Sequence, residues 1–277
     1  MRAVPRITTP YCSNAVRQSL LLQTRQFSLS CVHRNDNGSS TALNPRWFAD
    51  LRSRIKACLA ANPQGEDGAK LKQYLEFVDS NWLELSAGRE GFLTAERWRG
   101  LNKFAVAWGD MDSMGTLPMS RHVNNIMYNR YAESGRVNWI TSFAAFAPPD
   151  ERQQWVDIMS PRGIGLILKS IKTDYKLPVA YPDKITVIHK LAQRPTHTSD
   201  SIFLAAVIYS EAHKRVAARC FEDIAIYNYR AGKRATLKGF MVDELQKIYD
   251  LQEKSRLEVD EKVNELEQGV KMIEEKA

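Results

Sequence analysis

Residues 108–139 constrain the fold of this chain more than any other stretch of the sequence. Two carboxylates, Asp110 and Asp112, follow an alternating apolar run, and Asn124-Asn125 precedes a segment with apolar and small residues at three- and four-residue steps. Asn caps helices well, because its short side chain bonds N–H groups that have no intrahelical partner. The stretch therefore predicts a strand, an acidic turn, a loop and a capped helix, with a carboxylate near the positive end of the helix dipole.

The segments after this helix predict an antiparallel sheet. A first strand is expected before the acidic turn, and four more follow the helix; the expected ranges are 102–108, 163–175, 185–191, 202–209 and 216–229. The range 202–209 is apolar on both faces, which is typical of a central strand beneath a helix. The apolar phase shifts after Glu222-Asp223, which predicts a β-bulge at that point.

Helices are expected at both ends of the chain. Two amphipathic segments, near 47–55 and 69–85, are interpreted as a cover for an edge or end of the domain rather than a separate functional module. Past Thr236 the chain is highly charged, with a heptad-like apolar seam from Val259 to Ile273 that fails at Arg256 and Gln252. This short seam favours a solvated helix packed on the domain over a partner-binding zipper, and predicts that the helix is dispensable for chemistry.

The charge of the chain is concentrated near its start. The 277 residues carry a net charge of +7, with 39 basic and 32 acidic side chains, but no acid precedes Asp36 and five arginines do. The remainder is nearly neutral, so no nucleic-acid partner is expected. The longest apolar run, residues 202–209, is too short to span a bilayer, and no transmembrane segment is expected.

The first 35 residues have the composition of a mitochondrial presequence, rich in Arg, Ser and Thr. Residues 25–28 resemble a matrix processing site, whereas a secretory signal would need a longer apolar core than Leu20–Leu22. We expect a mitochondrial, matrix protein. The predicted divisions are the presequence (1–35), a linker with N-terminal helices (36–100), the main domain (101–236) and a charged helix (237–277).

The four cysteines, at positions 12, 31, 58 and 220, have no C-x-x-C spacing, and the five histidines are scattered. Neither a disulfide framework nor a zinc site is predicted, and no metal or cofactor is expected.

The pattern W-G-D-x-D-x-x-G, followed by H-V-N-N-x-x-Y-x-R-Y-x-E-x-x-R-x-x-W, resembles the signature of hotdog-fold thioesterases of the 4-hydroxybenzoyl-CoA thioesterase type. The motif covers about thirty residues directly, and the order of elements from Lys103 to Tyr229 fits the fold. The resemblance implies an α+β hotdog fold, in which an antiparallel sheet wraps a long central helix; here extra helices are expected at both ends.

The resemblance also implies a site. Asp112 corresponds to the nucleophile or general base, and the backbone N–H of Asn125 to the group that polarises the thioester carbonyl. His122 is either an acid–base group or a packed structural residue. Candidate substrate-binding residues are Asn124, Gly115 and Tyr128.

Other polar residues near the motif have structural explanations. We expect Asp110 to close a turn, and capping alone explains both asparagines of the H-V-N-N run. Glu133 and Arg136, three apart on the helix, can pair with each other. His189 faces the same way as Val187, which favours a histidine at the edge of the core over a ligand.

Two departures from the family pattern affect the site. Thr116–Arg121 are six additional residues between Gly115 and His122, and they can bulge outward, reshape the acyl pocket or separate Asp112 from its oxyanion donor. In plant acyl-carrier-protein thioesterases with this motif, an Asn lies two residues after the catalytic Asp; Met114 stands there in this chain. Mechanisms that need that Asn are disfavoured.

The function most favoured by these patterns is acyl-CoA thioester hydrolysis in mitochondria, with coenzyme A entering as part of the substrate. Because hotdog sites are commonly built between subunits, the resemblance implies a homodimer or a higher homo-oligomer. The main alternative is a catalytically silent hotdog protein that binds an acyl group or a mitochondrial assembly. A hotdog dehydratase is a weaker third interpretation, because those enzymes place their His and acidic residues differently.

Overall fold

A computed structural model describes residues 46–61, 64–112 and 122–276 of the chain. The predicted presequence, Gly115 and the Thr116–Arg121 insertion lie outside the described residues.

Helices precede, follow and cross the sheet. They are α1 (Trp47–Ala61), α2 (Gly65–Ser80), α3 (Asn125–Phe146), α4 (Pro149–Asp157) and α5 (Gly239–Glu274). The strands are β1 (Arg99–Ala105), β2 (Ile164–Tyr175), β3 (Lys184–Leu191), β4 (Ser201–Ser210), β5 (Arg215–Asn228) and β6 (Lys233–Arg234). The helix expected over 69–85 ends at Ser80, and one π-helical turn follows at Glu84–Gly88.

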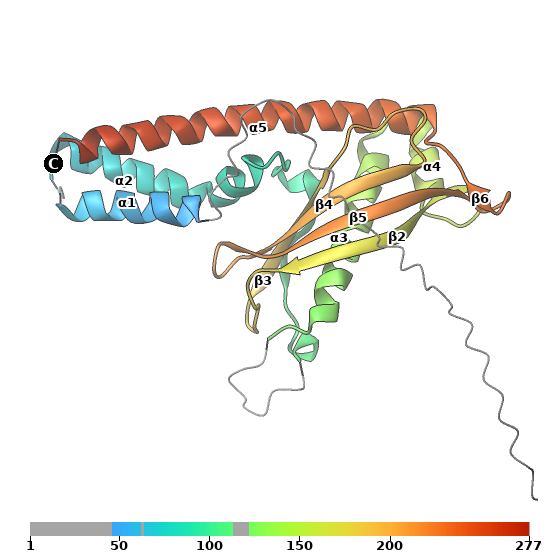
Figure 1. The fold of residues 1–277 in the computed structure, drawn as a ribbon, viewed down its shortest axis with the longest axis horizontal. Coiled ribbons are helices and arrows are strands. Elements are labelled where there is room, and N and C mark those ends of the chain that lie inside the picture. Colours follow the sequence, from blue (N-terminus) through green and yellow to red (C-terminus); the bar gives the residue numbers. More distant parts are fainter. Residues whose placement is uncertain (1–45, 62–63, 113–121, 277) are drawn as a thin grey trace, which may run out of the picture. The chain divides into compact units, whose positions relative to one another are not determined.

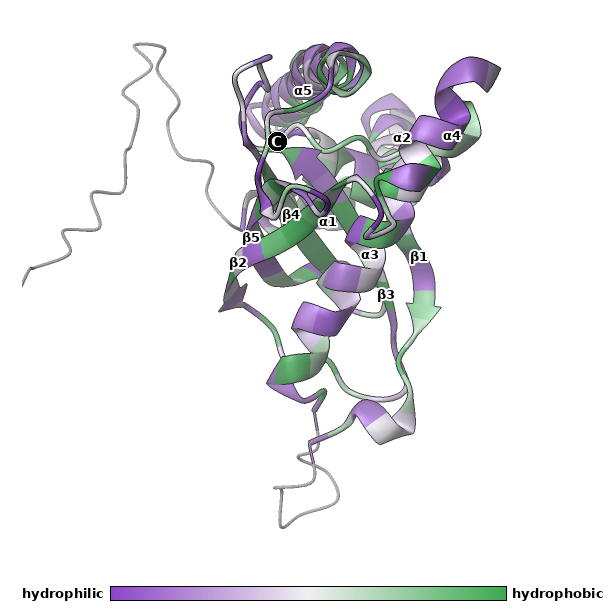
Figure 2. Ribbon diagram, turned by 90° about the vertical axis from the view of Figure 1, so that its right-hand side faces the viewer, coloured by the Kyte–Doolittle hydropathy of each residue, from purple (hydrophilic) through white to green (hydrophobic). Residues whose placement is uncertain are grey.

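The main path of the sheet has the strand order β1-β3-β4-β5-β2, and every pair in it is antiparallel. The central position of β4 confirms the prediction made from its two apolar faces. In Figure 2, α3 lies across one face of the sheet, between the edges formed by β1 and β2. A sheet wrapped around one long helix is the hotdog fold, and that prediction is confirmed.

Two local predictions were wrong. The first strand was expected to continue to Trp108, but β1 ends at Ala105 and Trp108–Asp110 forms a short 3-10 turn. The expected bulge lies on the neighbouring strand: the β2–β5 register shifts between Leu168 and Ser170, opposite Asp223. The additional residue is Lys169, whose ammonium lies 2.5 Å from the Asp223 carboxylate.

Small residues let the middle of α3 approach the sheet closely. A Cβ added to Gly135 would lie 2.8 Å from Cγ1 of Val187 on β3, which is closer than real Cβ contacts. A Cβ on Gly100 of β1 would overlap the backbone of Gly135. Gly135 therefore permits a close contact between α3 and the sheet.

The longest helix, α5, packs along most of its length. Its first half joins the hydrophobic core around Trp139, and its second half packs against α1 and α2, as Figure 1 shows. The apolar seam was predicted to be short; it begins at Met241 and reaches Ile273. Gln252, expected to interrupt the seam, is buried because its side-chain amide bonds both the N–H (3.0 Å) and the carbonyl (3.1 Å) of Leu191.

No helix within the described ranges is long and apolar enough to cross a membrane.

Candidate active site

The acidic turn is paired with the segment that leads into α3. Met111 and Val123 form an antiparallel bridge, the Asp112 N–H donates to the His122 carbonyl (2.7 Å), and the Asn124 N–H donates to the Asp110 carbonyl (2.9 Å). The residues on the two sides of 113–121 are therefore adjacent. The inserted residues do not separate Asp112 from the start of the central helix.

The N-terminus of α3 is capped as its sequence predicts. The side-chain oxygen of Asn124 accepts a hydrogen bond from the Ile126 N–H at 3.0 Å. The Asn125 N–H belongs to the first helical residue, where an α-helix supplies no acceptor of its own. The N–H of the first helical residue and the positive end of a 22-residue helix therefore lie beside the Asp112 turn.

Asp110 has a structural partner on the same helix. The Tyr131 hydroxyl donates to Oδ2 of Asp110 at 2.8 Å, and the Phe104 ring lies beside the Tyr131 ring, with centroids 6.1 Å apart. Burial, and then the hydrogen bond to Asp110, raise the pKa of Tyr131, so its hydroxyl stays protonated and donates. We expected Asp110 to close a turn; its side chain accepts from the body of α3, and no sequence pattern indicated Tyr131 as its partner.

His122 is half-buried at the edge of the turn. Its Nδ1 lies 3.1 Å from the Val123 carbonyl, which can only accept, so Nδ1 carries the proton. In the neutral ring Nε2 then keeps its lone pair.

Tyr128 was a candidate substrate contact, but its side chain bonds to the protein backbone. Its hydroxyl accepts from the Val179 N–H (3.0 Å) and lies 3.4 Å from the Leu177 carbonyl, and only 2% of the residue is exposed. Burial raises its pKa. Tyr128 therefore positions the loop before β3, and Asn124 is used as a cap.

Large apolar side chains are exposed around the turn. Trp108 is 58% exposed and packs edge-on against Tyr181, with ring centroids 5.8 Å apart, and Ile126 in the first turn of α3 is 73% exposed. Isolated exposed apolar residues are ordinary, but a group beside a polar site is typical of a ligand or subunit contact. No sequence pattern indicates that these side chains lie together.

A buried polar cluster lies farther along α3. Arg136 donates to Oε1 of Glu222 at 2.6 Å, and Nε2 of His189 lies 3.6 Å from the second carboxylate oxygen. The predicted pairing of Arg136 with Glu133 was wrong, because Arg136 faces the sheet and Glu133 is exposed. His189 is fully buried, not at the core edge, since it lies under α3 beside Trp139.

Burial dominates the titration of this cluster. It raises the pKa of Glu222 to about 7 against the attraction of Arg136, and it lowers the pKa of His189 to about 3, with Arg136 acting in the same direction. His189 is therefore neutral at pH 7, and its contact with Glu222 is not an ion pair. Among the described residues, neither ring nitrogen has a hydrogen-bond partner.

A serine, a histidine and an aspartate also meet at the end of β4, but they do not form a nucleophilic site. The buried Ser210 hydroxyl donates to Asp183 at 2.6 Å and lies 2.9 Å from Nδ1 of His213. Asp183 further accepts from the N–H groups of Lys184 and Ala212. The cluster fixes the β4–β5 hairpin against the start of β3.

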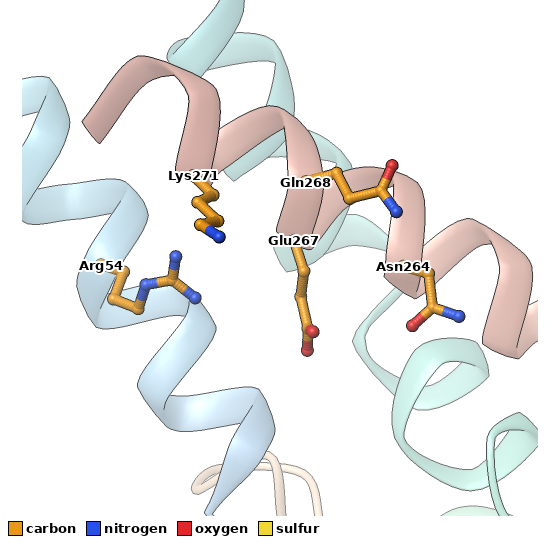
Figure 3. A pocket seen from close by; sticks show the side chains of 5 residues that line it. All are labelled: Arg54, Asn264, Glu267, Gln268 and Lys271. Carbon is orange, nitrogen blue, oxygen red and sulfur yellow. The ribbon is translucent and has the colours of Figure 1, made fainter. Parts of the chain in front are cut away.

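A groove of about 250 Å³ lies between α1 and α5, away from the acidic turn. Its polar lining, drawn in Figure 3, consists of Arg54, Asn264, Glu267, Gln268 and Lys271. Arg54 is already bonded to both oxygens of Glu274, at 2.9 and 2.5 Å. No group of three or more His, Cys, Asp or Glu side chains within the described parts of the chain is arranged to bind a metal ion.

Comparison with solved structures finds several thioesterases that are similar in part. A thioesterase from Thermus thermophilus, solved with coenzyme A and zinc, is 19% identical and matches 58% of this chain and 98% of its own, with a TM-score of 0.41. YbaW, a probable thioesterase from Escherichia coli, is 21% identical over 53% of this chain and 96% of its own (TM-score 0.39). A DHNA-CoA thioesterase from Staphylococcus aureus is 18% identical over 60% and 90% (TM-score 0.38).

No curated protein sequence matches the chain. The sequence model of the thioesterase-like superfamily matches residues 106–247, from the end of β1 to the first turns of α5. This match covers half of the chain and includes the whole acidic turn and α3, and the chain therefore belongs to the thioesterase-like superfamily.

Proposed function

We propose that this protein hydrolyses an acyl-CoA thioester to a free acid and coenzyme A. The observation that carries the proposal is the backbone pairing of residues 110–112 with 122–124, which puts the Asp112 turn beside the N-terminus of α3. Membership in the thioesterase-like superfamily supports the reaction class. Hydrolysis consumes only water, so the proposal includes no cofactor.

In the proposed reaction, Asp112 takes a proton from a water molecule as the water oxygen attacks the thioester carbonyl carbon. The Asn125 N–H donates to the resulting oxyanion, and the α3 dipole stabilises the same charge. When the C–S bond breaks, the thiolate of coenzyme A leaves and takes the proton from Asp112. Direct attack by the Asp112 carboxylate, followed by hydrolysis of the acyl–enzyme anhydride, also consumes one water molecule and gives the same free acid and coenzyme A.

A thiol-release assay of the purified protein against a panel of short, long and aromatic acyl-CoA thioesters tests the proposal. We expect one free thiol for each acid released, at a rate well above that of buffer. A protein that is folded but inactive on the whole panel would contradict the proposal.

The site is further proposed to be completed by a second copy of the chain. Among the described residues, β2 has β5 as its single strand neighbour, so one edge of this 12-residue strand is open to pairing. Its exposed Leu168 and Tyr175 support a contact there. Light scattering at micromolar concentration should give a dimer mass or a multiple of it; a monomer would contradict this part.

Mitochondrial import remains a proposal that rests on the arginine-rich, acid-free first 35 residues. Protein recovered from mitochondria should begin between Phe27 and Asp36. An intact Met1 terminus or a wholly cytosolic pool would contradict it.

The alternative is a silent hotdog protein that binds an acyl group or a mitochondrial assembly. It is favoured by α1, α2 and the second half of α5, which form a separate hydrophobic cluster outside the superfamily match. Tight binding of an intact acyl-CoA without thiol release would favour this alternative over hydrolysis.

A further inference from the structure

The turn that carries Asp112 is bonded to the body of α3 as well as to the segment before it. The backbone pairing fixes the turn relative to residues 122–124. The Tyr131 hydroxyl adds a hydrogen bond from farther along the helix, six residues beyond Asn125, which is about 9 Å along the axis. The turn therefore has a second attachment, independent of the backbone pairing.

The geometry of Tyr131 suits this task. The residue is 4% exposed, and it packs between Phe104 of β1 and Tyr128 of its own helix, with ring centroids 6.1 and 6.4 Å away. A ring packed on two sides has few other rotamers, so its hydroxyl stays directed at Asp110. Asp110 in turn offers its backbone carbonyl to the Asn124 cap, and thus connects the turn, the cap and the helix.

We propose that Tyr131 is a positioning residue, which through Asp110 fixes the Asp112 turn against the N-terminus of α3. As far as catalysis is concerned, this inference rests on the proposed thioester hydrolysis. The reason for a catalytic consequence is general: an error of about 1 Å in the placement of a reacting group can cost about 100-fold in rate.

Kinetics provide the first test. In Tyr131→Phe we expect kcat to fall about 10-fold or more with KM changed less than about twofold, because a displaced base affects the chemical step more than substrate binding. Asp110→Asn keeps an oxygen that can accept from Tyr131 and should retain turnover, whereas Asp110→Ala should lose as much as Tyr131→Phe. The double variant Tyr131→Phe/Asp110→Ala should be no slower than either single variant.

Tyr229→Phe, which lies beyond β5 and far along the chain from the turn, is the matched control and should keep wild-type rates. An unchanged kcat in Tyr131→Phe, or additive losses in the double variant, would overturn the proposal.

Hydrogen exchange provides a test that needs no activity. The Asp112 and Asn124 N–H groups are bonded across the turn, so in Tyr131→Phe we expect both to exchange about 10-fold faster, with Val179 unaffected. In Tyr128→Phe we expect the opposite pattern. The Val179 N–H should exchange faster, because the Tyr128 hydroxyl bonds it, and the exchange of the Asp112 and Asn124 N–H groups should not change.

Together, kinetics and hydrogen exchange distinguish failure of the positioning role from failure of the proposed function. Equal exchange of Asp112 and Asn124 in wild type and Tyr131→Phe would overturn the positioning role, whatever the activity. A wild-type protein without thioesterase activity whose Tyr131→Phe variant still loosens the turn would refute the proposed function and retain the positioning role.

Discussion

The two halves of α3 differ in what their buried side chains do. In the N-terminal half, Tyr128 and Tyr131 are buried aromatic residues whose hydroxyls bond a loop and the acidic turn. In the C-terminal half, Trp139 and Phe143 are equally buried, with ring centroids 4.7 Å apart, and pack with Trp155 of α4 in a hydrophobic cluster. The buried residues of the N-terminal half position polar backbone groups, and those of the C-terminal half fill the hydrophobic core.

The buried charges lie where these halves meet. Ala132 belongs to one hydrophobic cluster and Trp139 to the other, with Arg136 between them on α3, bonded to Glu222. Buried ion pairs cost desolvation energy and seldom add net stability. The difference teaches that the candidate site occupies the half with hydrogen-bonded tyrosines, while the opposite half joins the domain to α5.

Truncation after Thr236 should have the largest effect on this comparison, because it removes the α5 side of the C-terminal cluster. The buried residues lost from that cluster are Leu237, Met241, Val242, Leu245 and Ile248. Large-to-small changes at such positions cost about 2–5 kcal/mol each, and a domain is stable by about 5–15 kcal/mol. We expect no cooperative thermal unfolding of the truncated chain.

Truncation after Ser255 is the matched control. It keeps these five residues and Gln252, and removes the part of α5 that packs on α1 and α2. The hotdog domain should remain folded. A cooperative transition in the chain truncated after Thr236 would show that the domain folds without its contacts to α5.

Glu222→Gln tests the boundary between the halves. The pKa of Glu222 is about 7 in the folded chain and near 4.5 when unperturbed, so between these values the folded state binds a proton that the unfolded state has released. The resulting stability is fully present below pH 4.5 and is lost as the pH rises through 7. It amounts to on the order of 3 kcal/mol.

Urea unfolding of both proteins between pH 4.5 and 8 measures this difference. The free energy of unfolding of Glu222→Gln should rise relative to wild type with increasing pH, since glutamine does not titrate. Taking the difference removes the contribution of His189, whose lowered pKa gives the opposite slope at acid pH. Parallel pH profiles would show that Glu222 is already ionised in the folded protein at low pH.

Asn124→Ala should have the smallest effect and should be confined to the N-terminal half. Loss of the bond to the Ile126 N–H costs about 1 kcal/mol, the usual value for a helix cap. Asn124→Asp keeps an acceptor at the same position and should retain wild-type stability. A loss in Asn124→Ala far above this value, measured by urea unfolding, would indicate that the side chain does more than cap the helix.

The N-terminal half was largely predictable from sequence, because its signals are local. Helix capping at Asn124 and the strand-to-turn change before Asp110 follow from residue types at short spacing, although the end of β1 was placed three residues too late. The Tyr131–Asp110 bond was missed because it joins residues 21 apart whose facing depends on how the turn folds back.

The C-terminal half was less predictable, because its partners are distant in the chain. Arg136 is three residues from Glu133 and 86 from Glu222, and sequence spacing favoured the near partner. The apolar stripe of α5 was judged short because Gln252 interrupts it, and no pattern indicates that the backbone of Leu191 satisfies that amide.

Turnover of Asp112→Asn, measured beside Asp110→Asn on an acyl-CoA that the wild-type protein hydrolyses, tests the central claim most directly. The Asp112 substitution is nearly isosteric, so folding and oligomeric state should be preserved while kcat falls by about 10²- to 10⁴-fold, the usual contribution of a general base. Asp110→Asn should retain turnover, because its amide oxygen still accepts from Tyr131. An unchanged rate in Asp112→Asn would contradict the assignment of this turn as the active site.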